Sequence, residues 1–461
     1  MAKHLILVST FFSLLWVNST LQAQTKQTNA QKLIIRFDAA LKTDQVAALL
    51  RDENIETYEA LVPSLNLYLV TFKRPTSSKT FLKTFAGQSG IVKYAQPDHP
   101  VKLRQSPNDP ELKSQWSING ISSRGDIEAT KAWELGTGGK DTAGNEIVVA
   151  VVDGGTDISH KDLQKNIWVN KGEIPDNGID DDKNGYIDDI NGWNAIDDKG
   201  TLPTDKHDSG YMHGTHVAGI IGAEGNNNLQ VSGINWNTKI MPVAGSSGET
   251  SVVARAYGYV LAQKKLWLES HGKKGANIVA TNSSFGVDNA DCSSPDYSVW
   301  NDLYTEMGNV GIVSVVATSN SDVDVDSVGD VPSACESPYI ISVTNTDSND
   351  DKYAEGAGYG AKHVHLGAPG TDILSTVPDN KTRKLTGTSM ATPHVTGAVA
   401  LLHSVGSKRF TEMTQQNPAQ AAKQIKEILL KSVDPISGLK DITVTGGRLN
   451  VFKASQEISK Y

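Results

Sequence analysis

Ser389 lies between small residues in the segment 387–394, GTSMATPH, where a turn is expected to run into a helix. Such a turn exposes the hydroxyl, and the helix start directs free backbone N–H groups and the positive end of its dipole to the same place. This combination suits a nucleophile whose reaction generates an oxyanion. Because a Gly-Thr-Ser tripeptide is also common turn material, the prediction depends on two motifs upstream.

These two motifs supply an acid and an imidazole. Asp153 follows the apolar run 147–152, IVVAVV, which is typical of a buried parallel strand. His213 opens the segment HGTHVAG, where a helix is expected to begin. A serine hydroxyl is a poor nucleophile until a base takes its proton, and an imidazole titrates near neutral pH. The Asp153 carboxylate would hold the imidazole tautomer and stabilise the imidazolium.

The order Asp, His, Ser is that of the subtilisin triad, and the three segments resemble those of subtilisin-like serine proteases, the subtilases. The resemblance extends over about residues 106–454. It implies an endopeptidase that hydrolyses peptide bonds in proteins through an acyl-enzyme. The oxyanion would be stabilised by the backbone N–H of Ser389 and by Asn320, which ends the strand-like run 311–320. This chemistry requires no cofactor.

Each of these residues alone could have a structural role at a strand end, a helix start or a turn. A catalytically silent subtilase-like module that binds a partner is therefore the rival hypothesis. Such a relative should have lost at least one of Asp153, His213, Asn320 and Ser389, and this chain keeps all four. Their joint presence in order favours the enzyme. Within the enzyme class, a dedicated processing protease of narrow specificity is an alternative.

The first residues have the pattern of a secretory signal peptide. Lys3 and His4 precede an apolar run over residues 5–17, and small and polar residues follow up to Ala23. The apolar run is too short to cross a bilayer. Residues 1–23 are therefore predicted to be removed on export, which indicates a secreted or periplasmic protein.

Residues 24–105 are predicted to form a small α+β domain of ferredoxin-like type. Its expected elements are a strand at 32–37, a helix from Thr43, a strand at 65–72, a helix at 77–85 and a strand at 91–94. The domain precedes the segment 106–110, SPNDP, which resembles a subtilase mature start. The resemblance implies a propeptide that assists folding and inhibits the active site until self-cleavage. A stand-alone interaction domain is the alternative.

Residues 106–461 are predicted to form one large α/β peptidase domain. Strands are expected at 147–152, 239–243, 278–283, 313–317 and 340–343, and helices over 251–270, after Ser389 and from Asn417-Pro418. Strands that alternate with helices indicate a parallel sheet covered by helices on both faces. This is the subtilisin-like architecture.

The resemblance also implies a substrate cleft. Its residues would be Ser284, Phe285 and Gly286, at an edge that pairs with an extended substrate, and Ala317, Thr318, Ser319 and Asp330, around the P1 pocket. A carboxylate at Asp330, near the pocket floor, would favour lysine or arginine at P1. Because Asp322, Asp324 and Asp326 lie close by in the sequence, a solvated acidic surface is the alternative.

The segment 180–188, DDDKNGYID, matches the opening of an EF-hand-type calcium loop. Its ligands would be Asp180, Asp182, Asn184, the Tyr186 carbonyl and Asp188. The last position of the loop falls on Asn191, where a bidentate glutamate would be expected, and no flanking helix pair is evident. An acidic surface turn is therefore the alternative. A bound calcium is expected to stabilise the protein and not to take part in catalysis.

Cys292 and Cys335 are the only cysteines of the chain. In an exported protein two cysteines usually pair, and two buried free thiols are the alternative. The net charge of −9 suggests neither nucleic acid nor a membrane as a partner. The expected partners are protein or peptide substrates and the chain's own propeptide as inhibitor, and we expect a monomer.

Overall fold

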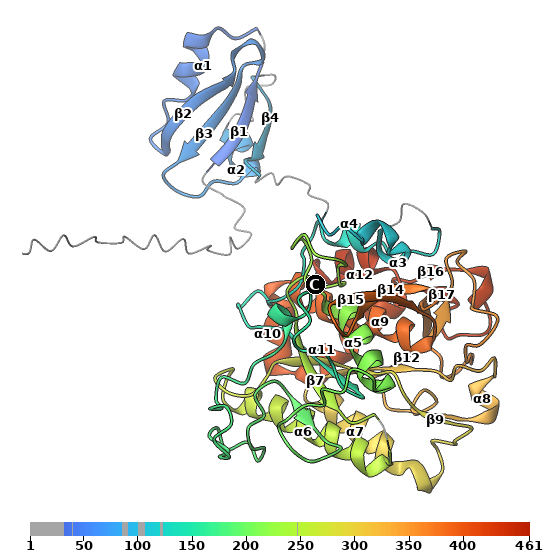
Figure 1. Cartoon of the computed structure of the whole chain (residues 1–461). Coiled ribbons are helices and arrows are strands. Elements are labelled where there is room, and N and C mark those ends of the chain that lie inside the picture. Colours follow the sequence, from blue (N-terminus) through green and yellow to red (C-terminus); the bar gives the residue numbers. More distant parts are fainter. Residues whose placement is uncertain (1–31, 39, 85–90, 100–106, 120–122, 247) are drawn as a thin grey trace, which may run out of the picture. The chain divides into compact units, whose positions relative to one another are not determined.

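The computed structural model describes residues 32–38, 40–84, 91–99, 107–119, 123–246 and 248–461 (Figure 1). The predicted signal peptide and the predicted maturation boundary at 105/106 lie outside these residues. The chain divides into two compact units, Met1–Leu103 and Arg104–Tyr461. Among the described helices, none combines the length and the apolar character that a membrane span requires.

The first unit is an antiparallel sheet with two helices. Its elements are β1 (Lys32–Phe37), α1 (Thr43–Leu49), β2 (Ile55–Val62), β3 (Leu67–Phe72), α2 (Ser78–Thr84) and β4 (Val92–Pro97), with strand order β2-β3-β1-β4. Alternate residues of β1 and β3, such as Leu33, Ile35 and Val70, form the core. Strand β2 was not predicted, because all its residues after Ile55 are exposed and its sequence carries no apolar alternation.

The second unit contains a nine-stranded sheet of order β16-β17-β13-β12-β10-β8-β5-β7-β6. The strands are β5 (Val148–Asp153), β6 (Trp193–Asn194), β7 (Lys239–Ala244), β8 (Ile278–Ser283), β10 (Val313–Ala317), β12 (Ile340–Thr346), β13 (Leu366–Pro369), β16 (Asp434–Pro435) and β17 (Gly447–Arg448). All neighbours are parallel except β16 and β17. The predicted parallel α/β sheet is confirmed.

Helices cover both faces of this sheet. The main ones are α5 (Ser209–Gly222), α6 (Thr250–Glu269), α7 (Ser298–Asn309), α9 (Thr388–Val405), α10 (Lys408–Gln416), α11 (Pro418–Lys431) and α12 (Val451–Ile458). In β5, Val149 and Val151 pack into the core with α5, α9, α11 and α12, whereas Val148 and Val152 pack with α6 and α7. Successive side chains of a strand point to opposite faces of the sheet, so a strand that is buried on both faces contributes to both cores.

Short elements fill the connections. They are α3 (Trp116–Asn119), α4 (Ala129–Ala132), α8 (Val325–Val328), the strand pair β9 (Val287–Asp288) and β11 (Asp330–Val331), and the hairpin β14 (Ile373–Val377) with β15 (Lys381–Leu385). Since parallel strands end at one edge, the segments that follow β5, β8 and β10 meet there. Ligands and catalytic groups of open α/β sheets gather at this carboxyl edge.

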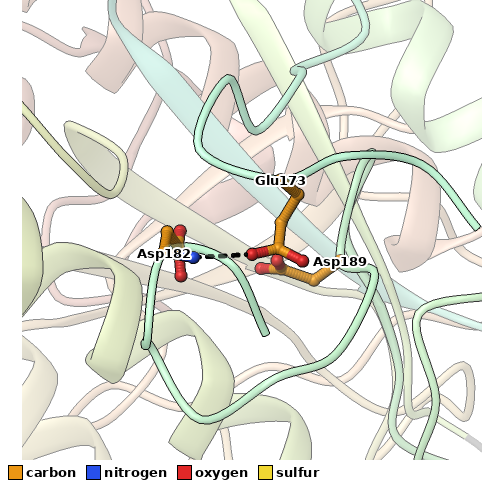
Figure 2. Close-up of side chains that lie close together, drawn as sticks. All are labelled: Glu173, Asp182 and Asp189. Carbon is orange, nitrogen blue, oxygen red and sulfur yellow. Dashed lines mark hydrogen bonds between the residues drawn. The ribbon is translucent and has the colours of Figure 1, made fainter. Parts of the chain in front are cut away.

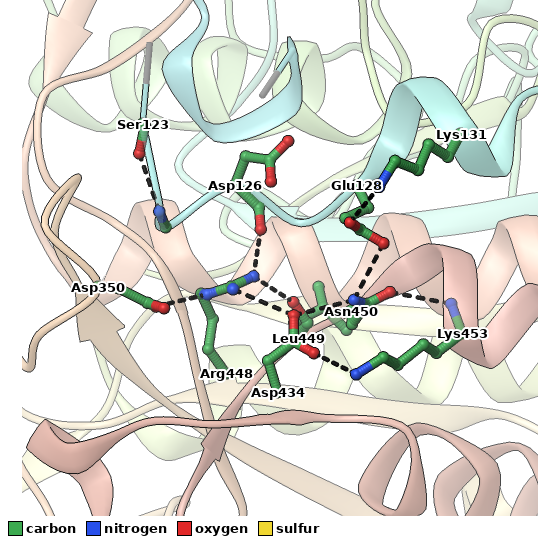
Figure 3. A network of polar contacts seen from close by, with 11 residues as sticks. Ser123, Asp126, Glu128, Lys131, Asp350, Asp434, Arg448, Leu449, Asn450 and Lys453 are labelled. Carbon is green, nitrogen blue, oxygen red and sulfur yellow. Dashed lines mark hydrogen bonds and ion pairs between the residues drawn. The ribbon is translucent and has the colours of Figure 1, made fainter. Parts of the chain in front are cut away.

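A buried arginine in β17 connects this strand to segments that are distant in the sequence (Figure 3). The Arg448 side chain is 4% exposed and forms ion pairs with Asp350 (2.6 Å) and Asp434 (3.1 Å). It also donates to the carbonyl of Asp126, and Asn450 donates to Asp434 at 2.9 Å. Because two carboxylates and a carbonyl satisfy the guanidinium, its charge is tolerated in the interior.

Candidate active site

Asp153 and His213 form a hydrogen-bonded pair. Asp153 ends β5, and α5 carries His213 two residues after Tyr211, whose backbone N–H is capped by Asp208 at 2.8 Å. The His213 Nδ1 atom lies 2.9 Å from each carboxylate oxygen of Asp153. The close approach of α5 requires a glycine, since a Cβ at Gly214 would lie 2.0 Å from the backbone oxygen of the loop after β5.

The environment of the pair makes the imidazole more basic. The Asp153 side chain is 3% exposed and the His213 side chain 29%. Burial lowers the pKa of His213, but the charge of Asp153 and the hydrogen bond to it outweigh burial, so the pKa is raised above its ordinary value. The Asp153 carboxylate also accepts the Gly154 N–H at 2.8 Å, which fixes its orientation.

Ser389 lies in the first turn of α9, where backbone N–H groups have no partner within the helix. Its Oγ donates to the Ser284 carbonyl at 3.3 Å, and the Ser284 hydroxyl donates to the Ser389 carbonyl at 3.0 Å. These reciprocal bonds hold the serine against the segment that follows β8. Helices α5 and α9, which carry His213 and Ser389, pack against each other.

Asn320 is oriented by the start of the same helix. Its Oδ1 accepts the Thr388 N–H at 2.9 Å and the Thr388 hydroxyl at 3.1 Å. A Cβ at Gly387 would lie only 3.2 Å from this oxygen, so the glycine permits the approach. With Oδ1 engaged, the Nδ2 group of Asn320 is the part available as a donor. Two donors suited to an oxyanion, Asn320 Nδ2 and the Ser389 N–H, therefore stand at one helix start.

A cleft of about 180 Å³ opens beside these residues. Its lining residues are Ser284, Phe285, Gly286, Asp288, Ala317, Thr318, Ser319, Asn320, Ser321, Asp330, Thr388 and Ser389. The structure thus brings all seven predicted substrate-binding residues together with Ser389 and Asn320. Sequence reasoning missed Asp288, Ser321 and Thr388, of which Asp288 lies in a two-residue strand without any periodic signal.

Asp330 is a buried wall residue of the cleft and is 2% exposed. Its Oδ2 accepts the Ser319 N–H at 3.0 Å and the Ser333 hydroxyl. Burial raises the pKa of Asp330 to about 6, although both hydrogen bonds act in the opposite direction. The neighbouring acidic residues have other partners, since Asp322 pairs with Lys352 and Asp326 with His363.

Cys292 and Cys335 form a disulfide, with their Cα atoms 5.2 Å apart. The bridge closes a loop of 43 residues and joins the segments that carry Asp288 and Asp330. On a chain-entropy model, a loop of this length contributes about 4 kcal/mol to stability. The disulfide thereby holds together the part of the cleft wall that these two aspartates supply.

Among the described residues, the predicted carboxylate ligands Asp180, Asp182 and Asp188 do not converge as a group of three. Asp180 accepts the backbone N–H groups of Asn184 and Gly185, and Asp188 accepts two further backbone N–H groups at 3.0 and 3.2 Å. The Asn184 amide donates to Asp182 at 3.2 Å. Because Asp and Asn side chains readily cap turns, the alternation of these residues stabilises the turn. The ring of Tyr186 packs on Trp193 at 4.8 Å.

A different group of carboxylates comes together at this loop (Figure 2). Glu173, Asp182 and Asp189 are all buried, and one oxygen from each lies within 4.8 Å of the others. Burial raises the pKa of Asp189 to about 7. Of these three residues only Asp182 was predicted. Glu173 lies outside the sequence motif, and the alternation of oxygen-bearing residues predicted Asp188 as a ligand instead of the adjacent Asp189.

His216 and His394, which flank the catalytic candidates in the sequence, are fully buried structural residues. His216 Nε2 contacts the carbonyls of Ile373 (2.9 Å) and Arg383 (3.0 Å), and His394 Nε2 contacts the Ser117 hydroxyl at 2.9 Å. Burial lowers their pKa values to about 3 and about 4. Both are therefore neutral at ordinary pH and unsuited to proton transfer.

Comparison with known proteins decides the family. A model of the subtilase family matches residues 144–448. This chain is a member of the subtilase family. The matched region contains all four candidate catalytic residues, so the geometry described above belongs to a member of a serine protease family.

Curated relatives of this subtilase are proteases. Subtilisin-like protease 1 of Plasmodium falciparum is 31% identical over 329 residues, which cover 66% of this chain and 43% of that protein. The extracellular basic protease of Dichelobacter nodosus is 28% identical over 371 residues, which cover 76% of this chain and 56% of the relative. This subtilase thus spans about half the length of the curated relatives it matches.

Solved structures share the fold. The epidermin leader peptide processing serine protease of Staphylococcus aureus aligns with a TM-score of 0.55 and 17% identity, over 92% of this chain and 98% of its own. A protease of Pseudoalteromonas arctica aligns with a TM-score of 0.52 and 22% identity, over 77% of this chain and 100% of its own. Both support the subtilisin-like architecture.

Proposed function

We propose that this subtilase is a serine endopeptidase in which Ser389 is the nucleophile, His213 the general base and Asp153 the residue that orients the base. The observation that carries the proposal is the contact of His213 Nδ1 with both Asp153 oxygens at 2.9 Å. At the same edge of the sheet, Ser389 lies in the first turn of α9, and Asn320 accepts a hydrogen bond from the first residue of that helix. This arrangement leaves His213 Nε2 as the nitrogen that exchanges protons with the substrate side.

The reaction then follows from the chemistry of each group. The Ser389 hydroxyl leaves the Ser284 carbonyl and attacks the scissile carbon as its proton passes to His213 Nε2. Asn320 Nδ2 and the Ser389 N–H donate to the oxyanion, and Asp153 stabilises the imidazolium. His213 returns the proton to the leaving amine, and the acyl-enzyme forms. Water repeats the sequence, with His213 as base, and releases the acid and free Ser389.

We also propose that the protein is exported and made as a zymogen in which the predicted propeptide, residues 24–105, is the inhibitor. Two observations support this: the first unit is compact by itself, and it exposes Tyr58, Leu61, Leu65 and Tyr94 by 40% to 44% each. Exposed apolar side chains are typical of a surface that binds a partner. Relatives named extracellular proteases are consistent with export.

Intact mass tests self-processing and the nucleophile together. The wild-type protein is expected to lose a segment that ends near residue 105, whereas the Ser389→Ala variant should retain it, because the variant cannot form the acyl-enzyme. Adding a trace of wild-type enzyme to the variant shows whether the bond is accessible. If both proteins keep the segment and neither hydrolyses casein, the proposal fails and the silent-module hypothesis replaces it.

For substrate recognition, we propose that Asp330 favours a basic P1 side chain and that the edge at Ser284 and Gly286 pairs with the substrate backbone. Asp330 is ionised above its pKa of about 6 and neutral below it. The ratio of kcat/KM for P1 Lys to that for P1 Leu should therefore fall as the pH drops through 6. Because the titration of His213 affects both substrates equally, it cancels in this ratio. In Asp330→Asn the ratio should be independent of pH; a flat wild-type ratio would contradict the role.

We further propose that Glu173, Asp182 and Asp189 hold a structural calcium ion. Hard oxygen ligands suit calcium, and the burial of three carboxylates is costly without a cation. In the part of the chain that the structure describes, no lysine, arginine or histidine forms an ion pair with these carboxylates, and Lys274 donates only to the backbone carbonyl of Asp182, at 3.1 Å. Asp189 instead accepts hydrogen bonds from Tyr259 and Gln263, whose buried Oε1 has no partner. The ion would neutralise the three carboxylates and stabilise the loop that carries them. It would take no part in catalysis.

Chelation is expected to lower the melting temperature by several degrees, because an ion at about 100 times its Kd adds about 2.7 kcal/mol to the free energy of unfolding. The measurement belongs in the Ser389→Ala background, where autolysis is absent. Asp189→Asn should remove the sensitivity to the chelator, whereas the neighbouring Asp188→Asn should keep it. Sensitivity that disappears with Asp188→Asn alone would favour the EF-hand-like ligand set instead.

A further inference from the structure

We propose that Asp288 is a second specificity-determining residue, which acts with Asp330 to select arginine over lysine at P1. The inference rests on the proposed peptidase function and concerns the same cleft. It assigns a role to a residue that the sequence pattern left out, and it narrows the substrate class from basic side chains to the guanidinium group.

The pairing of two short strands brings the aspartates together. Strands β9 and β11 are antiparallel, and Asp288 lies directly opposite Asp330 in their register. Residues in this relation have Cβ atoms about 4.5–5.5 Å apart and project to the same face. That face is the wall of the cleft, since both residues line it together with Ser389. The cleft therefore presents two carboxylates, one beside the other.

Neither Asp288 nor Asp330 forms an ion pair with a lysine, arginine or histidine among the residues that the structure describes. Like charges directly opposite each other destabilise a strand pair. The neighbouring aspartates Asp322 and Asp326, in contrast, are paired with Lys352 and His363. Burial is the main cause of the raised pKa of Asp330, and the negative charge of Asp288 acts in the same direction. A cation supplied by the substrate would relieve this repulsion.

The two carboxylates differ in depth, and this difference favours arginine. Asp330 is 2% exposed and its Oδ2 is held by Ser319 and Ser333, whereas Asp288 belongs to an exposed strand. A guanidinium carries five N–H donors in a planar fork and can bond two acceptors at once. An ammonium is a compact point charge that is strongly hydrated. Lysine would therefore engage the deep carboxylate and gain less from Asp288.

The strand pair is held rigidly enough to act as a specificity element. The Cys292–Cys335 disulfide joins the two chain segments just beyond it. Two glycines allow their close contact: a Cβ at Gly286 would lie 2.5 Å from the Val331 carbonyl oxygen, and one at Gly329 would lie 2.5 Å from that of Ala290. A carboxylate pair on a fixed scaffold discriminates by geometry, whereas a mobile one would respond only to charge.

Peptides that differ only at P1, with Arg, Lys or Leu, test the inference on the mature wild-type enzyme and on Asp288→Asn. We expect the wild type to prefer Arg to Lys and Lys to Leu. Asp288→Asn should lower kcat/KM for Arg by roughly fivefold, mainly through KM, and change Leu little. The ratio of Arg to Lys should fall. Asp302→Asn, an exposed aspartate of α7 outside the cleft, serves as the matched control and should change nothing.

Three outcomes would overturn the inference. One is an unchanged ratio of Arg to Lys in Asp288→Asn. Another is an equal loss with all three peptides, which would indicate damage to the fold or to catalysis. The third is a wild type that cleaves the Leu peptide best, in which case the acidic pocket fails while the peptidase function stands. Failure of the peptidase function itself is distinct, because no peptide would then be cleaved and Ser389→Ala would match the wild type.

Discussion

Replacing Ser389 with alanine is expected to lower kcat for a peptide substrate by about a millionfold, the loss that removal of the nucleophile causes in subtilisin. The reason is that the other hydroxyl at the start of α9, that of Thr388, is buried and donates to the Thr318 carbonyl at 2.6 Å, whereas the Ser389 hydroxyl lies where its own N–H and Asn320 can both serve the oxyanion. Substrate affinity should change little, since the cleft keeps its backbone edge and its acidic wall. Initial rates at saturating peptide measure the effect.

Ser321→Ala is the matched control for this variant, because Ser321 lines the same cleft but does not belong to helix α9. Its kcat should stay within a few-fold of the wild type, in keeping with the small effects of partly exposed substitutions. Circular dichroism should be the same for all three proteins. A Ser389→Ala protein that retains a tenth of the wild-type rate would show that another residue is the nucleophile.

Asp153→Asn is expected to reduce kcat by about 10,000-fold at neutral pH, although the geometry of the site should survive. Asp153 receives the Nδ1 hydrogen of His213, so Nε2 is left free to take the Ser389 proton. An asparagine can instead offer its amide to Nδ1 and stabilise the wrong tautomer. The loss should therefore appear in the chemical step and leave peptide binding intact.

The pH profile of this variant gives a second readout. His213 acts only when neutral, so activity is lost as the pH falls through its pKa, and Asp153 raises that pKa. The acidic limb of the residual activity in Asp153→Asn should shift to lower pH, because burial then acts without the opposing charge. Asp157→Asn changes another buried aspartate, which contacts Ser159 and not His213, and should keep the wild-type limb. An unshifted limb in Asp153→Asn would contradict the proposed pairing.

The sequence was sufficient to predict those elements whose pattern of residues lies within one short segment. The central strands are apolar runs buried on both faces, and the predicted bounds of β8 and β10 agree with the structure residue for residue. Asp153, Asn320 and Ser389 follow such strands or open a helix, so the order of elements places them at one edge. Strand β2 was missed because an edge strand exposed on most of its length carries neither apolar alternation nor an apolar run.

The tertiary structure alone decided which distant side chains share a site. The calcium motif pointed to Asp180 and Asp188, yet folding buries Asp189 beside Glu173, because Asp180 and Asp188 cap turns of the loop. Asp288 faces Asp330 through two-residue strands that are 42 positions apart and are held by a disulfide and close glycine contacts. Local chemistry was therefore enough to propose the catalytic residues of this subtilase. Pairing between segments, which depends on packing across the whole domain, determined its acidic sites.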